Sequence, residues 1–457
     1  MYLYRTQVGI RFINYVGGKY KRTLSVLGFL GVVVGYFLMA SMVYFLYQLL
    51  YLYLFVPEAV RAIKIPPLMP LIPYLPEAFK IDFLPPFYFT YWIISIAVIA
   101  LFHEFAHGII ARRYNIKILT TGFGFLGPFL AAFVEPDEKQ MESKPKYQQL
   151  AVLSAGVFTN FILAIFFFLL LSFFFSFAYI PAGALFNTYT PGAVAIENIS
   201  MIGGKPLLDR TEGGILNLIA TNGLTDDLVL GNNESTITLT NIVDDSGNFY
   251  YITIEKLKLQ LDLEESEYVF LYEDLPAINA GLRGTIIEID GQQIVDYDDL
   301  ARIMEGKKPG EKITLVTKDV ESETILNYDI TLGMDRTRAD KGVIGIGYSQ
   351  NNEKILGKVV DFFNFFKKPA TYYEPRFNGD FVLFLYNLIW WLALINLSVA
   401  LVNMWPVAIF DGGRFFYLTI WGITGNEKFA RFMFKAATYV ILLALVLLMV
   451  GWFRALF

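Results

Sequence analysis

The sequence from Tyr91 to Ala111 reads Tyr91-Trp-Ile-Ile-Ser-Ile-Ala-Val-Ile-Ala-Leu-Phe-His103-Glu104-Phe-Ala-His107-Gly-Ile-Ile-Ala111, an apolar run that carries three ionisable residues. Its length is close to the roughly 20 residues that a helix needs to cross a bilayer. Because residues four apart lie on one face of a helix, both imidazoles can reach one metal ion while Glu104 stands beside it. Ionisable side chains inside a membrane are costly and usually functional. The stretch therefore predicts a metal site in a membrane helix, in preference to two histidines that only pack in a bundle.

A catalytic zinc ion has three protein ligands and one open position, so this site needs a third ligand. The chain has only these two histidines and no cysteine, which leaves a carboxylate. The best candidate is Asp411, which ends another apolar stretch in the sequence Asn403-Met-Trp-Pro-Val-Ala-Ile-Phe-Asp411-Gly-Gly-Arg414. We predict that Asp411 completes the metal site. The alternative is that Asp-Gly-Gly only forms a turn that ends a helix.

The whole chain has the composition of a membrane protein. Of its 457 residues 55% are hydrophobic, and the mean hydropathy of +0.48 is too high for an ordinary soluble enzyme. The absence of cysteine excludes disulfides, iron–sulfur clusters and thiol nucleophiles. The predicted fold class is a polytopic α-helical membrane protein with about five transmembrane helices, at about residues 25–55, 87–111, 149–180, 381–410 and 432–453.

An uneven distribution of charge predicts the orientation of the chain. Residues 185–345 contain 28 acidic and 13 basic residues, a net charge of −15, whereas the rest of the chain has a net charge of +10. Short cytoplasmic loops of membrane proteins are enriched in Lys and Arg. We therefore expect a cytoplasmic N-terminus, a first span that acts as a signal anchor, and an extracytoplasmic insert. The predicted domains are two membrane parts and the insert between them, at residues 1–184, 346–457 and 185–345.

The insert has the alternating apolar and polar runs of water-soluble β structure, such as Ile237–Thr240 and Tyr250–Ile254. From residue 275 onward its sequence resembles the second half of a PDZ domain. The order is a short helix, a strand, a turn, a second helix and a strand, on Leu275–Leu282, Thr285–Gly291, Tyr297–Leu300 and Pro309-Gly310. We expect an inserted α+β PDZ-like domain, and the alternative is an unrelated small α+β domain. Residues 193–260 either supply its remaining strands or form a second copy.

Three motifs resemble those of the site-2 protease family of intramembrane metalloproteases. His103-Glu-Phe-Ala-His107 is similar to the family's zinc helix, and Asn403-x-x-Pro406 followed by Asp411-Gly-Gly is similar to its second signature. Gly156-Val-Phe-Thr-Asn160 is similar to the Gly-x-x-x-Asn element of the next span. The chain departs from the common pattern at Val157, where the family often has Pro, and at Phe410, where it often has Leu. Both positions stay apolar, so the assignment is unchanged.

The resemblance implies the role of each site residue. His103, His107 and Asp411 would bind Zn²⁺, and Glu104 would be the general base. Asn160 and Asn403 would lie near the metal and bind the substrate backbone or polarise its carbonyl. The alternative for these two is that they only satisfy buried backbone groups between helices.

Residues 121–135 are apolar, yet their glycines and proline make them poor helix formers. Irregular backbone at membrane depth is tolerated only where it is buried in protein or lines a wet cavity. The family resemblance implies a re-entrant hairpin beside the active site. We expect this hairpin to offer an edge to an unwound strand of the substrate.

The predicted function is hydrolysis of peptide bonds in membrane-spanning substrates by a zinc metalloendopeptidase. The expected partners are single-span membrane proteins and the lipid bilayer, with no nucleic acid, and the expected location is a prokaryotic plasma membrane. One alternative is a non-catalytic membrane scaffold that binds extracellular peptides through the PDZ-like insert. A zinc protease of another fold is disfavoured because no second intramembrane Glu is present, and a transporter is disfavoured because no inverted repeat is visible.

Overall fold

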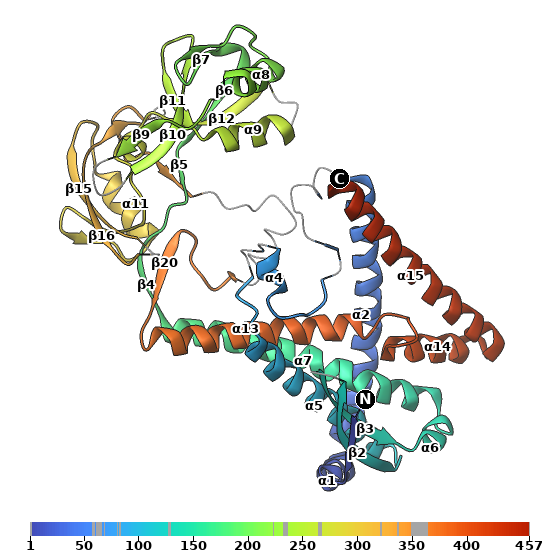
Figure 1. The fold of residues 1–457 in the computed structure, drawn as a ribbon. Helices are drawn as coiled ribbons and strands as arrows, with labels where there is room; N and C mark the ends of the chain where they lie inside the picture. The colour runs from blue at the N-terminus through green and yellow to red at the C-terminus, as the bar shows by residue number, and fades with distance from the viewer. Residues whose placement is uncertain are drawn as a thin grey trace. The chain divides into compact units, whose positions relative to one another are not determined.

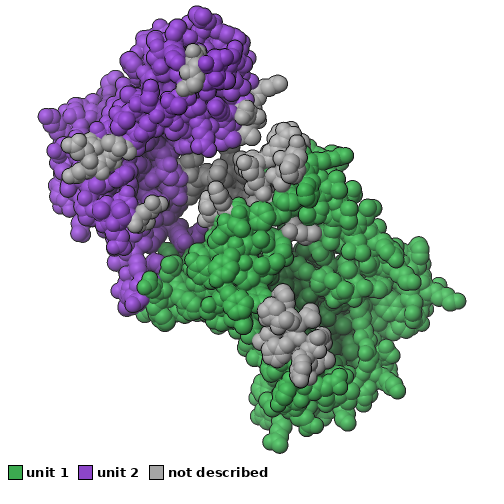
Figure 2. Space-filling model, in the orientation of Figure 1, with its two compact units in different colours: residues 1–177, 380–457 green, residues 178–379 purple. Residues whose placement is uncertain are grey.

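A computed structural model of the chain describes residues 2–56, 60, 66–67, 69–79, 81, 84–126, 129–222, 224–231, 236–263, 267–319, 322–335, 338–348 and 364–456. The chain forms two compact units (Figure 2). Unit 1 consists of residues 1–177 and 380–457, and unit 2 consists of residues 178–379.

Within the described residues, unit 1 contains five helices that are long and apolar enough to cross a membrane (Figure 1). These are α2 (Lys21–Phe55), α5 (Phe89–Arg113), α7 (Lys146–Ala178), α13 (Gly379–Val402) and α15 (Glu427–Leu456). At 1.5 Å per residue, even a helix of 24 residues is roughly 36 Å long, which exceeds the hydrocarbon core of about 30 Å. The prediction of a multi-pass helical membrane protein is confirmed.

The fourth span is shorter than its sequence predicts. The apolar stretch continues to Phe410, but helix α13 ends at Val402 and the chain turns before helix α14 (Asp411–Thr424) begins. Pro406 explains the break, because proline lacks an N–H and disfavours helical backbone at the residue before it. Asp411 therefore begins a helix. It does not end a span.

Unit 1 also contains a three-stranded antiparallel sheet, of which two strands lie between the second and third spans in the sequence and one precedes the first span. Its strand order is β1-β2-β3, with β1 at Tyr2–Thr6, β2 at Ile118–Leu126 and β3 at Phe129–Pro136. Strands β2 and β3 form the predicted hairpin in residues 121–135. Strand β1 was not predicted, and it pairs with β2 from Tyr2 opposite Phe125 to Thr6 opposite Thr121.

Short helices complete unit 1. They are α1 (Ile10–Lys19), α4 (Leu75–Ala78) and α6 (Glu138–Glu142). Helix α6 follows β3 directly, and the Asp137 carboxylate caps it by accepting a 3.0 Å hydrogen bond from Gln140 N.

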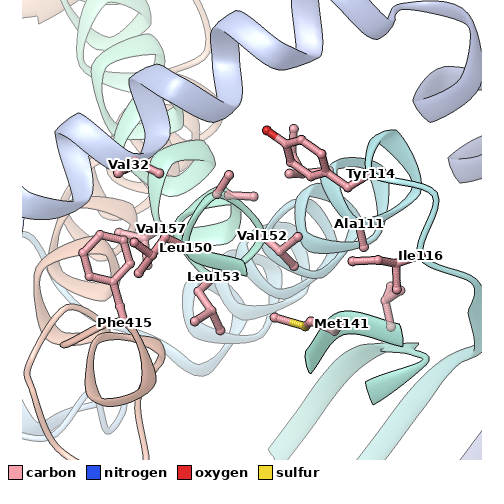
Figure 3. Packing of buried hydrophobic residues seen from close by; sticks show 14 of the residues in the cluster. Val32, Ala111, Tyr114, Ile116, Met141, Leu150, Val152, Leu153, Val157 and Phe415 are labelled. Carbon is pink, nitrogen blue, oxygen red and sulfur yellow. The ribbon is translucent and has the colours of Figure 1, made fainter. Parts of the chain in front are cut away.

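The core of unit 1 joins helices α2, α5, α7 and α14. Figure 3 shows part of it, with Val32, Ala111, Val152, Val157 and Phe415 among the labelled side chains. Helix α2 approaches closely through its glycines. A Cβ at Gly31 would lie 3.1 Å from Ser154 Oγ on α7, and a Cβ at Gly35 would lie 3.3 Å from the side chains of Met404 and Phe415. Gly31 and Gly35, which are four residues apart on α2, thus pack against the helix that carries Asn160 and against residues on both sides of Asp411 in the sequence.

Unit 2 contains two main sheets, each with its own hydrophobic core. The first has the strand order β16-β15-β13-β4-β20, with β14 on β13. These strands are β4 (Tyr179–Ala184), β13 (Thr285–Ile289), β14 (Gln292–Gln293), β15 (Lys312–Lys318), β16 (Ile325–Thr331) and β20 (Thr371–Pro375). Its helices are α10 (Pro276–Asn279) and α11 (Tyr297–Glu305). Short pairs lie beside it, namely β5 (Thr188–Tyr189) with β19 (Ile346–Gly347) and β17 (Gly333–Met334) with β18 (Gly342–Val343).

The second sheet has the strand order β6-β12-β11-β10-β7-β8, with β9 on β10. Its strands are β6 (Pro191–Ala195), β7 (Ile199–Ile202), β8 (Lys205–Pro206), β9 (Leu228–Gly231), β10 (Thr236–Asp244), β11 (Phe249–Ile252) and β12 (Tyr268–Glu273). A short turn of 3-10 helix (Ile196–Asn198) and helices α8 (Glu212–Asn222) and α9 (Ile254–Leu263) belong to the same part of the chain. Most of residues 193–260 therefore build a separate sheet and supply no strand to the sheet of β13.

Candidate metal centre

Helix α5 places His103, Glu104 and His107 in the half of the span that leads to Arg112 and Arg113. The Nε2 atoms of the two histidines lie 3.0 Å apart. At this distance both ring nitrogens can bind the same metal ion, as the four-residue spacing predicts. The two side chains are 10% and 13% exposed, so they are almost removed from solvent.

Asp411 reaches the same point from the first turn of α14. Its Oδ2 lies 3.2 Å from His103 Nε2 and 3.4 Å from His107 Nε2. One ligand atom from each of the three residues lies within 4.8 Å of the other two. The fold thus brings the Asp411 carboxylate to two imidazoles from which it is separated by more than 300 positions in the sequence.

The two glycines after Asp411 make this approach possible. Gly412 N donates a 2.7 Å hydrogen bond to Asn403 O, which closes the turn between α13 and α14. A Cβ at Gly412 would collide with the Met404 backbone, and one at Gly413 would collide with the Val407 carbonyl. Asp-Gly-Gly is therefore a tight entry into a helix. The motif begins helix α14 and does not end a helix.

The second nitrogen of each histidine has a hydrogen-bond partner that leaves Nε2 free for a metal. His107 Nδ1 lies 2.7 Å from the carbonyl oxygen of Val152, so Nδ1 carries the proton and donates it. His103 Nδ1 lies 3.0 Å from Asn160 Nδ2. Metal-binding histidines almost always donate the opposite ring N–H to such a partner.

The Asn160 amide supports the same proton placement on His103. Within the described part of the chain, its Oδ1 is buried and has no hydrogen-bond partner. A half-turn of the amide exchanges nitrogen and oxygen, so that Oδ1 accepts a proton from His103 Nδ1. That exchange satisfies the buried oxygen and leaves His103 Nε2 as a lone-pair donor. Two neutral imidazoles and one carboxylate are a donor set that fits zinc.

Gly156 provides the space in which the two rings meet. It lies on α7, one turn before Asn160, and a Cβ added there would lie 2.5 Å from His107 Nε2 and 2.6 Å from His103 Nε2. No side chain larger than hydrogen fits at that distance. The Gly-x-x-x-Asn element thus has two functions in one turn: its glycine admits the ligand atoms and its asparagine orients one of them.

Replacing Gly156 by alanine should remove the metal and leave the fold intact, because the new methyl group would occupy the space between the two Nε2 atoms. Zinc content per purified chain, measured by elemental analysis, should fall from about one to a small fraction of that. Gly28→Ala is the matched control, because its Cβ would lie 3.4 Å from the nearest atom, an ordinary van der Waals distance. Full zinc occupancy in Gly156→Ala would contradict this account of the site.

Glu104 points toward the β-hairpin. Its Oε2 accepts a 3.0 Å hydrogen bond from the Val134 backbone N–H on β3. Helix α5 also packs closely against this hairpin, because a Cβ at Gly108 would lie 2.9 Å from the Val134 side chain. The hairpin therefore holds the carboxylate of the residue that follows His103 on α5.

The two asparagines of the sequence motifs differ in their contacts. Asn160 is fully buried and contacts His103, whereas Asn403 is half-buried and contributes its backbone carbonyl to the turn before Asp411. Sequence reasoning missed the Val152 carbonyl and the Val134 N–H. Every residue has a backbone carbonyl and every residue except proline has a backbone N–H, so no signal in the sequence marks them.

This arrangement is a group of side chains that could hold a metal ion in a multi-pass membrane protein. The chain belongs to peptidase family M50, the site-2 protease family, because a sequence profile of "Peptidase family M50" matches residues 91–449. A relative from Neisseria meningitidis serogroup A, named "Putative zinc metalloprotease NMA0084", is 22% identical over 446 residues, which cover 79% of this chain and 97% of the relative. The family and this relative indicate that the cofactor is zinc.

Proposed function

We propose that the protein is an intramembrane zinc endopeptidase that cleaves single-span membrane proteins. The observation that carries this proposal is the convergence of His103, His107 and Asp411, with Glu104 beside them, at one end of a membrane-spanning helix. The test is cleavage of a panel of single-span substrates by the purified chain, with and without a zinc chelator. The matched inactive chain is Glu104→Gln, whose expected behaviour opens the Discussion.

In this proposal His103, His107 and Asp411 hold the metal and Glu104 moves the proton. Zinc supplies a Lewis acid that polarises the scissile carbonyl and makes water a stronger acid. Glu104 accepts the proton of the attacking water and later gives it to the leaving amine. Its Oε2 is engaged by Val134 N, and Oε1 has no partner among the described residues, which leaves that oxygen to accept the proton.

We propose that the substrate binds along the outer edge of β3. In the sheet order β1-β2-β3 both edges of β2 are paired, while β3 has one partner among the described strands. An exposed strand edge can take a further strand, and an extended segment is the form in which a peptide bond is accessible. The hydrogen bond from Val134 N to Glu104 links this strand to the proposed general base.

We propose that unit 2 is a PDZ-like filter that selects substrates. The predicted order of short helix, strand, turn, helix and strand is present as α10, β13, the turn at Asp290 and Gly291, α11 and β15, with the short strand β14 after the turn. Between α11 and residues 341–346 lies a cavity of about 560 Å³, lined in part by Tyr297, Leu300 and Met304. A groove between a helix and a strand suits an extended peptide. The same groove would serve the alternative function, a non-catalytic scaffold for extracellular peptides.

Deleting most of unit 2 should leave the peptide-bond cleavage reaction intact. Ala184 and Thr371 are paired residues of β4 and β20, so a short glycine turn can join them and replace the intervening chain. We expect this deletion to cleave short single-span substrates in a chelator-sensitive reaction and to accept substrates with bulky extracellular domains, compared with the full chain in a gel assay. Loss of all cleavage in a folded, zinc-loaded deletion would refute a purely selective role.

We propose that the N-terminus is cytoplasmic and that unit 2 lies outside. The basic residues after α5 and α14 and the acidic composition of unit 2 support this orientation. Because the chain lacks cysteine, single-cysteine variants can be labelled without background. Ser246→Cys should react with an impermeant maleimide on intact cells, whereas Ser143→Cys, exposed on the opposite side, should react only after lysis. The reverse pattern would overturn the orientation.

A further inference from the structure

Helix α1 packs along the half of α5 that carries the metal site. Glycines on both helices allow this close approach. A Cβ at Gly9 would lie 2.8 Å from the Phe105 ring, one at Gly17 would lie 2.8 Å from Arg112 Cβ, and one at Gly108 would lie 3.1 Å from Ile13 Cδ1. Ile13 is fully buried. One face of α1 is therefore covered by helix α5.

A second face of α1 is largely exposed. Phe12, Tyr15 and Lys19 recur at spacings of three and four residues, which places them on one stripe of the helix, and Val8 lies in the turn just before it. Phe12 borders α5, where its ring centroid lies 6.1 Å from that of Phe105. Val8 is 77% exposed, Phe12 55% and Tyr15 57%. The Lys19 amine covers the Tyr15 ring, 4.9 Å from its centroid, and leaves the rest of the aromatic surface open.

Basic residues occur before, within and just after α1 in the sequence. The N-terminal region contains Arg5, Arg11, Lys19, Lys21 and Arg22, and no Asp or Glu occurs before Glu58. Arg5 lies 4.0 Å from Glu135. In the part of the chain that the structure describes, the other four cations have no carboxylate within salt-bridge distance. The segment therefore presents aromatic side chains and unpaired positive charge together.

The position of α1 identifies the partner. Helix α1 ends at Lys19, and α2, which is long and apolar enough to span the membrane, begins at Lys21. With one residue between them, α1 must lie at the membrane surface where α2 enters. Amphipathic helices with aromatic and basic residues bind in the headgroup region, and positive charge there attracts anionic lipids. We propose that residues 4–22 form a binding surface for anionic phospholipids.

This surface is joined to the metal site by packing and by the sheet. Strand β1 precedes α1 and pairs with β2, and Thr121 Oγ1 donates hydrogen bonds to the carbonyls of Thr6 and Val8. Lipid that holds α1 against the membrane also holds it against Phe105 and Gly108 of α5. Binding of anionic lipid therefore rigidifies the N-terminal strand, α1 and the end of α5 as one element. The lipid surface does not depend on the reaction that the site catalyses.

The test is hydrogen–deuterium exchange of the full chain in lipid nanodiscs, read in peptides from residues 2–20 and 105–113. In nanodiscs that contain 30% phosphatidylglycerol, exchange should be several-fold slower than in pure phosphatidylcholine, and 0.5 M salt should abolish the difference. Free glycerol 3-phosphate added to phosphatidylcholine nanodiscs should have no effect, because the surface binds lipid in the bilayer. Equal exchange in the two lipids would overturn the proposal.

Charge variants locate the effect. Arg11→Gln, Lys19→Gln and Arg22→Gln combined should remove the response to phosphatidylglycerol. The matched control combines Lys139→Gln, Lys428→Gln and Lys435→Gln, three exposed cations elsewhere in unit 1, and should keep the response. Equal loss in both triple variants would show a general charge effect and would overturn the assignment to residues 4–22. The lipid comparison on the unmodified chain decides the matter if a variant does not fold.

Discussion

Glu104→Gln is expected to lower the cleavage rate by about two to four orders of magnitude, because general acid–base catalysis contributes that much and an amide cannot accept the proton of the attacking water. The substitution keeps the size of the side chain and its ability to accept a hydrogen bond from Val134 N. The zinc content should stay at about one per chain, since no ligand role is assigned to Glu104. Substrate binding should also persist, so the variant should capture substrates that it does not cut. Single-turnover cleavage and elemental analysis on the same preparation measure both quantities.

Glu142→Gln is a suitable control for this substitution. Glu142 lies on α6, its side chain is 66% exposed, and its carboxylate is 3.9 Å from Arg414, so its contribution should be small. It should cleave at nearly the rate of the unmodified chain. Near-normal cleavage by Glu104→Gln would mean that another group activates the water. Absence of cleavage in the unmodified chain, with zinc bound, would instead favour the scaffold function.

The part of the site that depends on local geometry was predictable from the sequence. His103 and His107 are one helical turn apart, so their convergence follows from the period of the helix alone. Asp411 was found by elimination, because only a carboxylate remained as a third ligand. The resemblance to a known family supplied Asn160, and the structure adds the physical reason for its place, a contact with His103 Nδ1.

Features that depend on long-range backbone contacts were not predictable. The Val152 carbonyl and the Val134 N–H act through groups that every residue has, so only the fold selects them. Strand β1 depends on pairing with residues more than 100 positions away, and no local sequence pattern predicts it. The end of the fourth span was misplaced because the stretch from Asn403 to Phe410 stays apolar, although Pro406 offered a signal for the break.

The fold of unit 2 was predictable in its local elements and less so in its assembly. The alternating run Ile237–Thr240 lies in β10. The run Tyr250–Ile254 begins in β11, but this strand ends at Ile252 and Ile254 is already the first residue of α9. Apolar alternation identifies a strand but not its neighbours. The grouping of these strands into a sheet separate from that of β13 therefore had to come from the structure.

His107→Ala and Asp411→Ala are each expected to abolish stoichiometric zinc binding, with cleavage lost in parallel. Each substitution removes one of the three ligand atoms that converge within 4.8 Å among the residues that the structure describes. Loss of a partner that merely orients a ligand weakens metal affinity by about 10- to 100-fold, and loss of a direct ligand should cost at least as much. Asn160→Ala should therefore fall between these variants and the unmodified chain, because Asn160 contacts His103 and is not itself assigned as a ligand.

Zinc affinity measured by competition with a chromophoric chelator ranks the variants on one scale. Asp380→Asn is the matched control for Asp411→Ala, because Asp380 also stands in the first turn of a helix but lies on the exposed surface. It should bind zinc as the unmodified chain does. Retention of full zinc occupancy in Asp411→Ala would show that a different group is the third ligand. In that case the 3.2 Å approach of Asp411 to His103 would be an ion pair or hydrogen bond that orients the imidazole, and the search for the ligand would return to Glu104, the nearest remaining carboxylate on α5.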